Sequence, residues 1–179
     1  FTYTVLIPLL VFLPVFISGS LVVDSITEEI DQGTMELLRV APVTLAEIVD
    51  GKAAAAIGIA PGQALIWLLL LEANGTSVAN VGPILALMTA LTTLVVAVAV
   101  GISAVAPDRR AAQLLYSVAV LVLFGGATAM AGGPANAVAR LAIDSADAAT
   151  GVLVVAYAVI AGAAYLGVRR VVAAEGLGR

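Results

Sequence analysis

Five long apolar segments, none of which holds a charged residue, constrain this chain more than any other feature. An α-helix needs about 20 apolar residues to cross the ~30 Å hydrocarbon core of a bilayer, and each segment has about that length. A charge at the bilayer centre costs about 2.5–3.5 kcal/mol on insertion scales, so uncharged interiors suit helices that are surrounded by lipid. We therefore predict an all-α, polytopic membrane helix bundle that forms a single transmembrane domain over residues 1–179. The five predicted spans are residues 3–23, 53–71, 84–106, 111–131 and 150–168.

The composition excludes several other classes of protein. The chain is 62% hydrophobic and 11% charged, whereas an average soluble domain has roughly 25% charged residues. It contains no Cys and no His, which excludes disulfides, thiol catalysis and the metal sites that depend on these residues. A net charge of −4 gives no basic surface for nucleic acid. We expect the chain to lie in membrane lipid and to have no nucleic-acid partner, no metal and no catalytic residue.

Basic residues in short loops predict the orientation in a cytoplasmic membrane, because cytoplasmic loops carry an excess of Lys and Arg. If residues 24–52 are cytoplasmic, seven of the eight basic residues lie inside and only Arg140 lies outside. The seven are Arg39, Lys52, Arg109, Arg110, Arg169, Arg170 and Arg179. The N-terminus of the chain is then outside and the C-terminus is cytoplasmic. Because the first apolar run begins directly at Phe1, we expect an N-terminal truncation and interpret the five spans as the last five of six.

Residues 24–52, between the first two predicted spans, hold seven acidic and two basic residues. The Thr34 hydroxyl can cap a short helix by accepting hydrogen bonds from the free N–H groups of its first turn. Glu36 in that turn is favoured by the helix dipole and shares a face with Arg39. Pro42 ends the helix, because the residue before a proline avoids the α region. The residues alone leave two interpretations open, a solvated loop on the lipid headgroups or a docking element for a cytoplasmic partner.

A second helix start follows this short helix. Thr44 and Glu47 have the spacing of a capping box, in which each side chain accepts a hydrogen bond from the backbone N–H of the other residue. We expect the helix that begins there to run past Lys52 into the span at residues 53–71.

Taken together, this stretch resembles the cytoplasmic region after the second span in type-2 ABC exporter permeases, the sodium- and drug-efflux-like group. The shared pattern is an acidic cluster, Gly-Thr, an acidic residue, leucines, a Pro, a capping box and a Gly-Lys. The matching residues are Glu29, Gly33, Thr34, Glu36, Leu37, Leu38, Pro42, Val43, Thr44, Glu47, Ile48, Gly51 and Lys52. Where that family has basic residues in the acidic cluster, this chain has Ile30 and Gln32, so its docking surface would use a different charge pattern.

The resemblance implies the membrane-spanning permease subunit of an ATP-driven exporter that works by alternating access. Residues 24–52 would include a coupling helix that sits in a groove of a separate ABC ATPase. The partners implied are two copies of that ATPase and a second permease, in a homodimer or a heterodimer. ATP and Mg²⁺ would bind to the ATPase, and this chain would bind no cofactor.

The resemblance also implies which residues transmit ATPase movement. The coupling residues would be Glu29, Gly33, Thr34, Glu36, Leu37, Leu38, Arg39, Pro42, Glu47 and Lys52. A second and shorter cytoplasmic contact would be made by Asp108, Arg109 and Arg110.

Two other classes of protein stay open from the sequence. One is a membrane scaffold or assembly protein without transport, and the other is a self-powered secondary carrier. No Asp, Glu, Lys or Arg lies within the five spans, so they lack the ion-pair relay that proton-driven carriers use. Energy supplied from outside the membrane therefore fits better, which favours the ATP-driven permease. The Ala, Val, Leu and Thr of the spans are compatible with sodium, drugs, lipids, peptides and glycans as substrates.

The loop at residues 132–149, on the predicted outer side, is too polar to span the membrane. Within it, Asn136, Arg140, Asp144 and Asp147 recur at spacings of four, four and three residues. This spacing predicts a short amphipathic helix that lies at the membrane interface, with these four residues as its polar stripe.

Asn74 begins the sequence Asn-Gly-Thr in the other predicted outer loop. This tripeptide is a glycosylation sequon. Such tripeptides are frequent by chance, so an unmodified surface loop is the simpler interpretation of Asn74.

Overall fold

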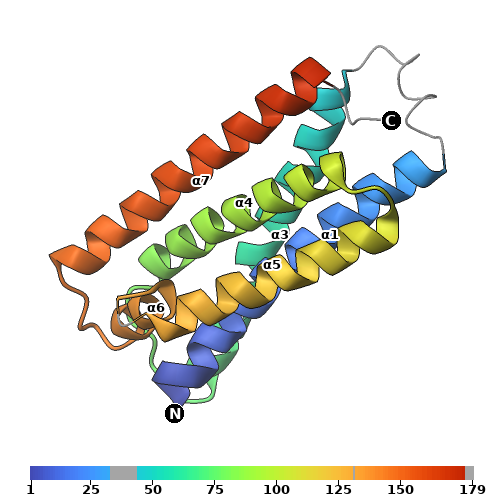
Figure 1. Ribbon diagram of the computed structural model, residues 1–179. Coiled ribbons are helices and arrows are strands. Elements are labelled where there is room, and N and C mark those ends of the chain that lie inside the picture. Colours follow the sequence, from blue (N-terminus) through green and yellow to red (C-terminus); the bar gives the residue numbers. More distant parts are fainter. Residues whose placement is uncertain (33–43, 131, 176–179) are drawn as a thin grey trace.

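The computed structural model describes residues 1–32, 44–130 and 132–175, and every regular element within them is a helix (Figure 1). In chain order the elements are a short π-helix η1 (Thr2–Leu6), α1 (Ile7–Asp31), α3 (Leu45–Ala73), α4 (Val81–Val105), α5 (Arg109–Ala129), α6 (Pro134–Ala142) and α7 (Ala148–Glu175). The predicted all-α helix bundle is confirmed.

Four helices of the described chain are long and apolar enough to cross a membrane. They are Thr2–Asp31, Ala46–Ala73, Val81–Val105 and Ala148–Ala174, and they correspond to the first, second, third and fifth predicted spans. The fourth predicted span forms the 21-residue helix α5, whose first residues are Arg109 and Arg110. Because α5 is not among the four, its crossing of the membrane stays a prediction.

The central helix of the bundle is α4, which lies between α7 on one side and α1 and α5 on the other (Figure 1). In the membrane-spanning part of α4, 61% of the residues are buried, against 6% in that of α7. A helix that is apolar on all sides can pack against several neighbours at once. In contrast, α7 leaves Val152, Val155 and Val159 more than half exposed, as suits a helix with a lipid-facing side.

Helices α1, α4 and α5 meet closely at Gly19. A Cβ atom at this position would lie 2.6 Å from Cγ1 of Val95 in α4 and against the hydroxyl of Tyr116 in α5. The same hydroxyl donates a hydrogen bond to the carbonyl oxygen of Phe16 in α1 (2.5 Å). Small residues let helix backbones approach closely in membranes, and here only glycine fits unless a neighbouring side chain moves.

Residues 132–149 contain the short helix α6, which is shorter than the predicted polar stripe implied. Its position at the membrane interface stays a prediction. Val138 and Leu141 on its apolar side are 0% and 5% exposed. The helix ends at Ala142, and Asp144 follows it with a left-handed φ of 56°.

The prediction that Asp144 and Asp147 extend this stripe is wrong, because each carboxylate satisfies donors at a chain turn. Asp144 accepts a hydrogen bond from Nδ2 of Asn80 at 2.8 Å. Asp147 accepts from the hydroxyl (2.7 Å) and the backbone N–H (2.8 Å) of Thr150 at the start of α7. Those two bonds lower the pKa of the Asp147 carboxyl. The two acids therefore fix the path of the chain between α6 and α7.

The helix ends gather at two opposite ends of the bundle (Figure 1). The end of α1, the start of α3, the turn between α4 and α5 and the end of α7 share one end, which we call the ion-pair end. The N-terminus, residues 74–80 and α6 share the other, which we call the α6 end.

Candidate functional site

At the ion-pair end, an ion pair joins the end of α1 to the start of α3. Lys52 Nζ lies 2.8 Å from Oε1 of Glu29, and the two side chains are only 21% and 28% exposed. The same ammonium also donates to the hydroxyl and the carbonyl oxygen of Ser25. Two of the predicted coupling residues, far apart in the sequence, are thus brought together. Their contact ties the two helices that flank residues 33–43.

The start of α3 has the predicted capping box. Glu47 N–H donates to Oγ1 of Thr44 at 3.2 Å, and Thr44 N–H donates to Oε2 of Glu47 at 2.6 Å. The Thr44 hydroxyl donates to the same carboxylate oxygen at 2.8 Å. Because both free N–H groups are satisfied locally, α3 starts at a defined residue directly after residues 33–43.

The other predicted coupling residues lie outside the described residues. They are Gly33, Thr34, Glu36, Leu37, Leu38, Arg39 and Pro42. The coupling helix itself stays a prediction, and the structure places the two helix ends between which it would be held.

The turn between α4 and α5 contains the predicted second contact, and its three residues have different surroundings. Asp108 Oδ1 accepts from the backbone N–H of Ala111 at 2.7 Å and so caps α5. Arg109 donates from Nε (3.1 Å) and Nη2 (2.9 Å) to Oδ1 of Asp24 in α1. Arg110 is exposed. In this structure Arg109 is therefore engaged with a neighbouring helix, and Arg110 is the member of the trio that is open to a partner.

A third group at this end was not anticipated from the sequence. Asp50 in α3 accepts from the hydroxyl of Tyr165 at Oδ1 (2.7 Å) and from Nε of Arg169 at Oδ2 (2.7 Å), and both donors belong to α7. We call these three residues the α3–α7 clasp. The signal that could have indicated it is the spacing of Tyr165 and Arg169, since residues four apart lie on the same face of a helix.

Three ion pairs thus join four helices in a row across the ion-pair end, from α7 to α3, α3 to α1 and α1 to α5. They are Arg169–Asp50, Lys52–Glu29 and Arg109–Asp24. Elsewhere in the described chain there is one further pair, Arg140–Asp147 at the α6 end. Because partly exposed ion pairs are worth about 0–1 kcal/mol each, the row sets how the helix ends lie relative to one another more than it stabilises the fold.

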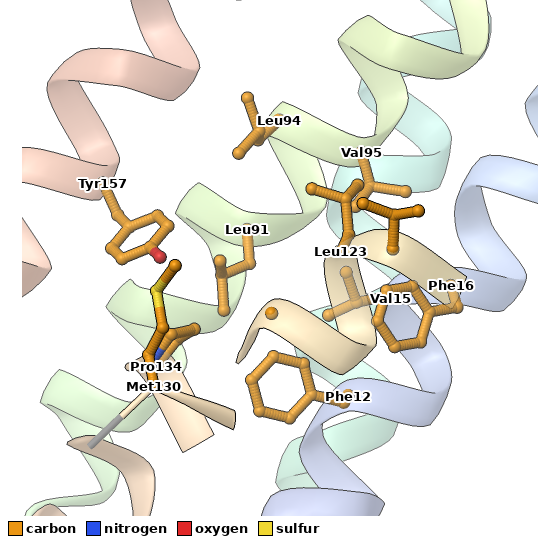
Figure 2. Close-up of a pocket in the computed structure, with 12 residues that line it drawn as sticks. Phe12, Val15, Phe16, Leu91, Leu94, Val95, Leu123, Met130, Pro134 and Tyr157 are labelled. Carbon is orange, nitrogen blue, oxygen red and sulfur yellow. The ribbon is translucent and has the colours of Figure 1, made fainter. Parts of the chain in front are cut away.

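A pocket of about 290 Å³ opens between α1, α4, α5, α6 and α7, nearer to the α6 end. Figure 2 shows Phe12 and Phe16 of α1 on one side and Tyr157 of α7 on the other, with Leu91 between them. The described residues that line it are Phe12, Val15, Phe16, Leu91, Leu94, Val95, Val122, Leu123, Gly126, Met130, Pro134 and Tyr157. The volume is at the lower end of the range of about 300–1,000 Å³ for ligand pockets. With no charged residue in its wall, the pocket can accept an apolar group.

The sequence profile of a family described as "ABC-2 family transporter protein" matches residues 1–168. The chain belongs to the ABC-2 transporter family. This match confirms the resemblance to an ABC-2-type permease that residues 24–52 indicated, and it extends that resemblance to most of the chain. Searches of curated proteins and of solved structures gave no match.

Membership of the ABC-2 family fixes the general role of the bundle. An ABC-2 chain is the membrane component of an ABC transporter and is not itself the catalytic subunit, and the family generally works with an ABC ATPase. The apolar helices agree with a multi-pass location in a membrane. The row of ion pairs is then a feature of a transporter's membrane component.

The sequon residue of this ABC-2 permease, Asn74, lies at the end of α3. It is exposed, and its Nδ2 donates to the carbonyl oxygen of Leu70 at 2.8 Å, which also accepts the backbone N–H of Asn74 at 3.1 Å. Asn74 therefore has a structural role as a helix cap, and its glycosylation stays a prediction.

Proposed function

We propose that this chain is the permease subunit of an ATP-driven exporter in the cytoplasmic membrane, and that it works by alternating access with a separate ABC ATPase. ATP and Mg²⁺ bind to the ATPase, and this chain contributes no cofactor site. The assembly holds two ATPase copies and two permeases, as a homodimer or as a heterodimer with a similar chain. The ion-pair end faces the cytoplasm and the α6 end faces outside.

The family match over residues 1–168 is the observation that carries this proposal. The arrangement of the ion-pair end adds support. Residues 33–43 connect α1 to α3, and the 2.8 Å ion pair between Glu29, near the end of α1, and Lys52, two turns into α3, ties these two helices together. Because the two flanking helices are tied to each other by this pair, a push that reaches one of them is passed to the other. We therefore assign the docking of the ATPase to residues 33–43, with Glu36 and Arg39 as its charged contacts.

Co-purification tests this function. The permease is expressed in full length with each ABC ATPase subunit encoded in the same genome in turn, and the complexes are isolated in lipid nanodiscs. We expect the ATPase to co-purify and its hydrolysis rate to rise when the permease is present. Replacing both Glu36→Gln and Arg39→Gln should abolish binding and stimulation. Glu72→Gln, an exposed acid at the α6 end, is the matched control and should change neither.

Two results would contradict the proposal. If no ATPase binds the native permease, the chain acts as a scaffold or as a self-powered carrier instead. If the ATPase binds the Glu36/Arg39 variant as well as the native protein, the docking segment lies elsewhere.

A further inference from the structure

The α3–α7 clasp points to a role beyond docking. We propose that Asp50, Tyr165 and Arg169 join the start of α3 and the end of α7 into one rigid unit, so that α7 follows α3 when the ATPase moves residues 33–43. Asp50 and Arg169 are then positioning residues for transport, acting through the helices that they join. This inference rests on the proposed function and adds a second helix to the part of the permease that the ATPase moves.

The geometry of the clasp opposes sliding between the two helices. Both oxygens of the Asp50 carboxylate are engaged, Oδ1 by Tyr165 and Oδ2 by Arg169, each at 2.7 Å. The two donors are one turn apart on α7. A shift of α7 along its axis would therefore break both bonds at once, and hydrogen bonds that involve a charged partner are about twice as strong as neutral ones.

Buried apolar residues flank the clasp on both helices. Val49 and Ala53, on either side of Asp50 in α3, are 2% and 0% exposed, and Val172, three residues after Arg169 in α7, is 1% exposed. The polar bonds therefore lie at the rim of a packed region, which limits rotation of either helix.

The clasp is the point at which α7 is tied to α3 by side-chain bonds. Over its membrane-spanning part α7 is 6% buried, and its packing is mainly against α4. The first turns of α3 reach two neighbours, because Asp50 contacts α7 and Lys52 contacts Glu29 of α1. A displacement of residues 33–43 can thus reach α1 and α7 through a single short stretch of α3.

Distance measurements between spin labels test the clasp. The chain has no Cys, so Gly51→Cys in α3 and Ala173→Cys in α7, both exposed, can be labelled selectively. The distance between the labels is measured by pulsed electron paramagnetic resonance in the permease–ATPase complex, without nucleotide and with ATP and vanadate. Labelled permease is diluted with unlabelled permease so that distances within one chain dominate, and we expect that distance to be narrowly distributed and the same in both states.

Variants separate the clasp from general stability. Arg169→Gln and Tyr165→Phe should broaden the distribution and make it depend on nucleotide, and both should lose most of the ATPase stimulation while still binding the ATPase. Arg170→Gln, the adjacent exposed arginine, is the matched control and should behave as the native protein. Exchanging the charges in Asp50→Arg/Arg169→Asp should restore a narrow distribution.

The possible outcomes distinguish failure of the clasp from failure of the proposed function. A nucleotide-dependent distance in the native protein, or an Arg169→Gln variant that matches Arg170→Gln, would overturn the clasp while leaving the proposed function intact. Absence of ATPase binding by the native permease, measured on the same samples, would overturn the proposed function and the role of the clasp with it.

Discussion

The two ends of this permease are held together by different kinds of contact. At the ion-pair end, side chains of long helices meet in three partly exposed ion pairs. At the α6 end, most hydrogen bonds between residues that are far apart in the sequence involve backbone groups. Ala79 N–H donates to the carbonyl oxygen of Ala142 (2.9 Å), Asn80 Nδ2 to that of Leu141 (3.2 Å) and the Tyr3 hydroxyl to that of Ser77 (2.8 Å).

This difference suits a molecule that moves at one end. Partly exposed ion pairs contribute little to the free energy of folding, because water competes for each partner, so they join helix ends to one another without locking that end to the rest of the bundle. Backbone hydrogen bonds beside buried apolar residues are costly to leave unmade. We therefore expect the α6 end to hold its shape during transport while the ion-pair end responds to the ATPase. The following changes test that contrast.

The largest expected effect is an all-or-none difference in labelling between the ends. Arg110→Cys lies at the ion-pair end and Ser145→Cys at the α6 end, and both positions are exposed. In intact cells, a membrane-impermeant maleimide should label only Ser145→Cys, and permeabilised cells should also show labelling of Arg110→Cys. The reverse pattern would show that the ion-pair end faces outside.

A smaller but clear loss of stability is expected from a cavity at the α6 end. Leu141 is 5% exposed, and Leu→Ala in a packed core costs about 2–5 kcal/mol. Leu141→Ala should lower the unfolding temperature in detergent by several degrees. Ile143→Ala, two residues on and 53% exposed, should leave that temperature nearly unchanged. Equal shifts in the two variants would mean that α6 is not packed tightly against the bundle.

A change at the ion-pair end should affect coupling more than stability. Lys52→Gln removes the Glu29 pair, whose partly exposed setting limits its value to about 1 kcal/mol or less. The unfolding temperature should fall by no more than a few degrees, while ATPase stimulation should fall strongly. If Lys52→Gln lowers the unfolding temperature as much as Leu141→Ala does but leaves ATPase stimulation at the native level, the two ends do not differ in the way expected.

The smallest expected effect concerns Asp147 at the α6 end, whose pKa is lowered by its hydrogen bonds to Thr150. A carboxyl with a lowered pKa in the folded state stabilises the protein above its unfolded pKa of about 3.9 and loses this contribution as the pH falls through the folded value. Asp147→Asn should therefore be slightly less stable than the native protein at neutral pH. The difference in unfolding temperature should begin to shrink as the pH falls below the unfolded pKa of about 3.9, and it should disappear below the lowered folded pKa. A constant difference across this range would assign the effect to packing instead of charge.

Local features of the fold could be predicted from the sequence, whereas contacts between distant residues could not. The spans and the capping box of Thr44 and Glu47 depend on residues close together in the chain. The capping box and four of the five predicted spans are confirmed. The polar stripe at residues 132–149 was extended too far because Asp144 and Asp147 satisfy donors at turns, which a periodic pattern does not distinguish from a helix face.

In the candidate site too, single residues could be predicted from the sequence, whereas the contacts between them could not. Glu29 and Lys52 were identified as single positions by a resemblance, but their ion pair required the packing of α1 against α3. The α3–α7 clasp joins residues 115 and 119 positions apart. The spacing of Tyr165 and Arg169 places the two donors on one face of α7, but no local spacing in the sequence identifies Asp50 as their partner.

The close approach at Gly19 has a consequence for the divergence of related sequences. Because a Cβ atom there would lie within 2.6 Å of Val95 Cγ1 and against the Tyr116 hydroxyl, a larger residue is acceptable only where those side chains become smaller in the same lineage. We expect the three positions to change together or not at all. Joint variation at these positions among related sequences would indicate that α1, α4 and α5 keep the same close contact in those proteins.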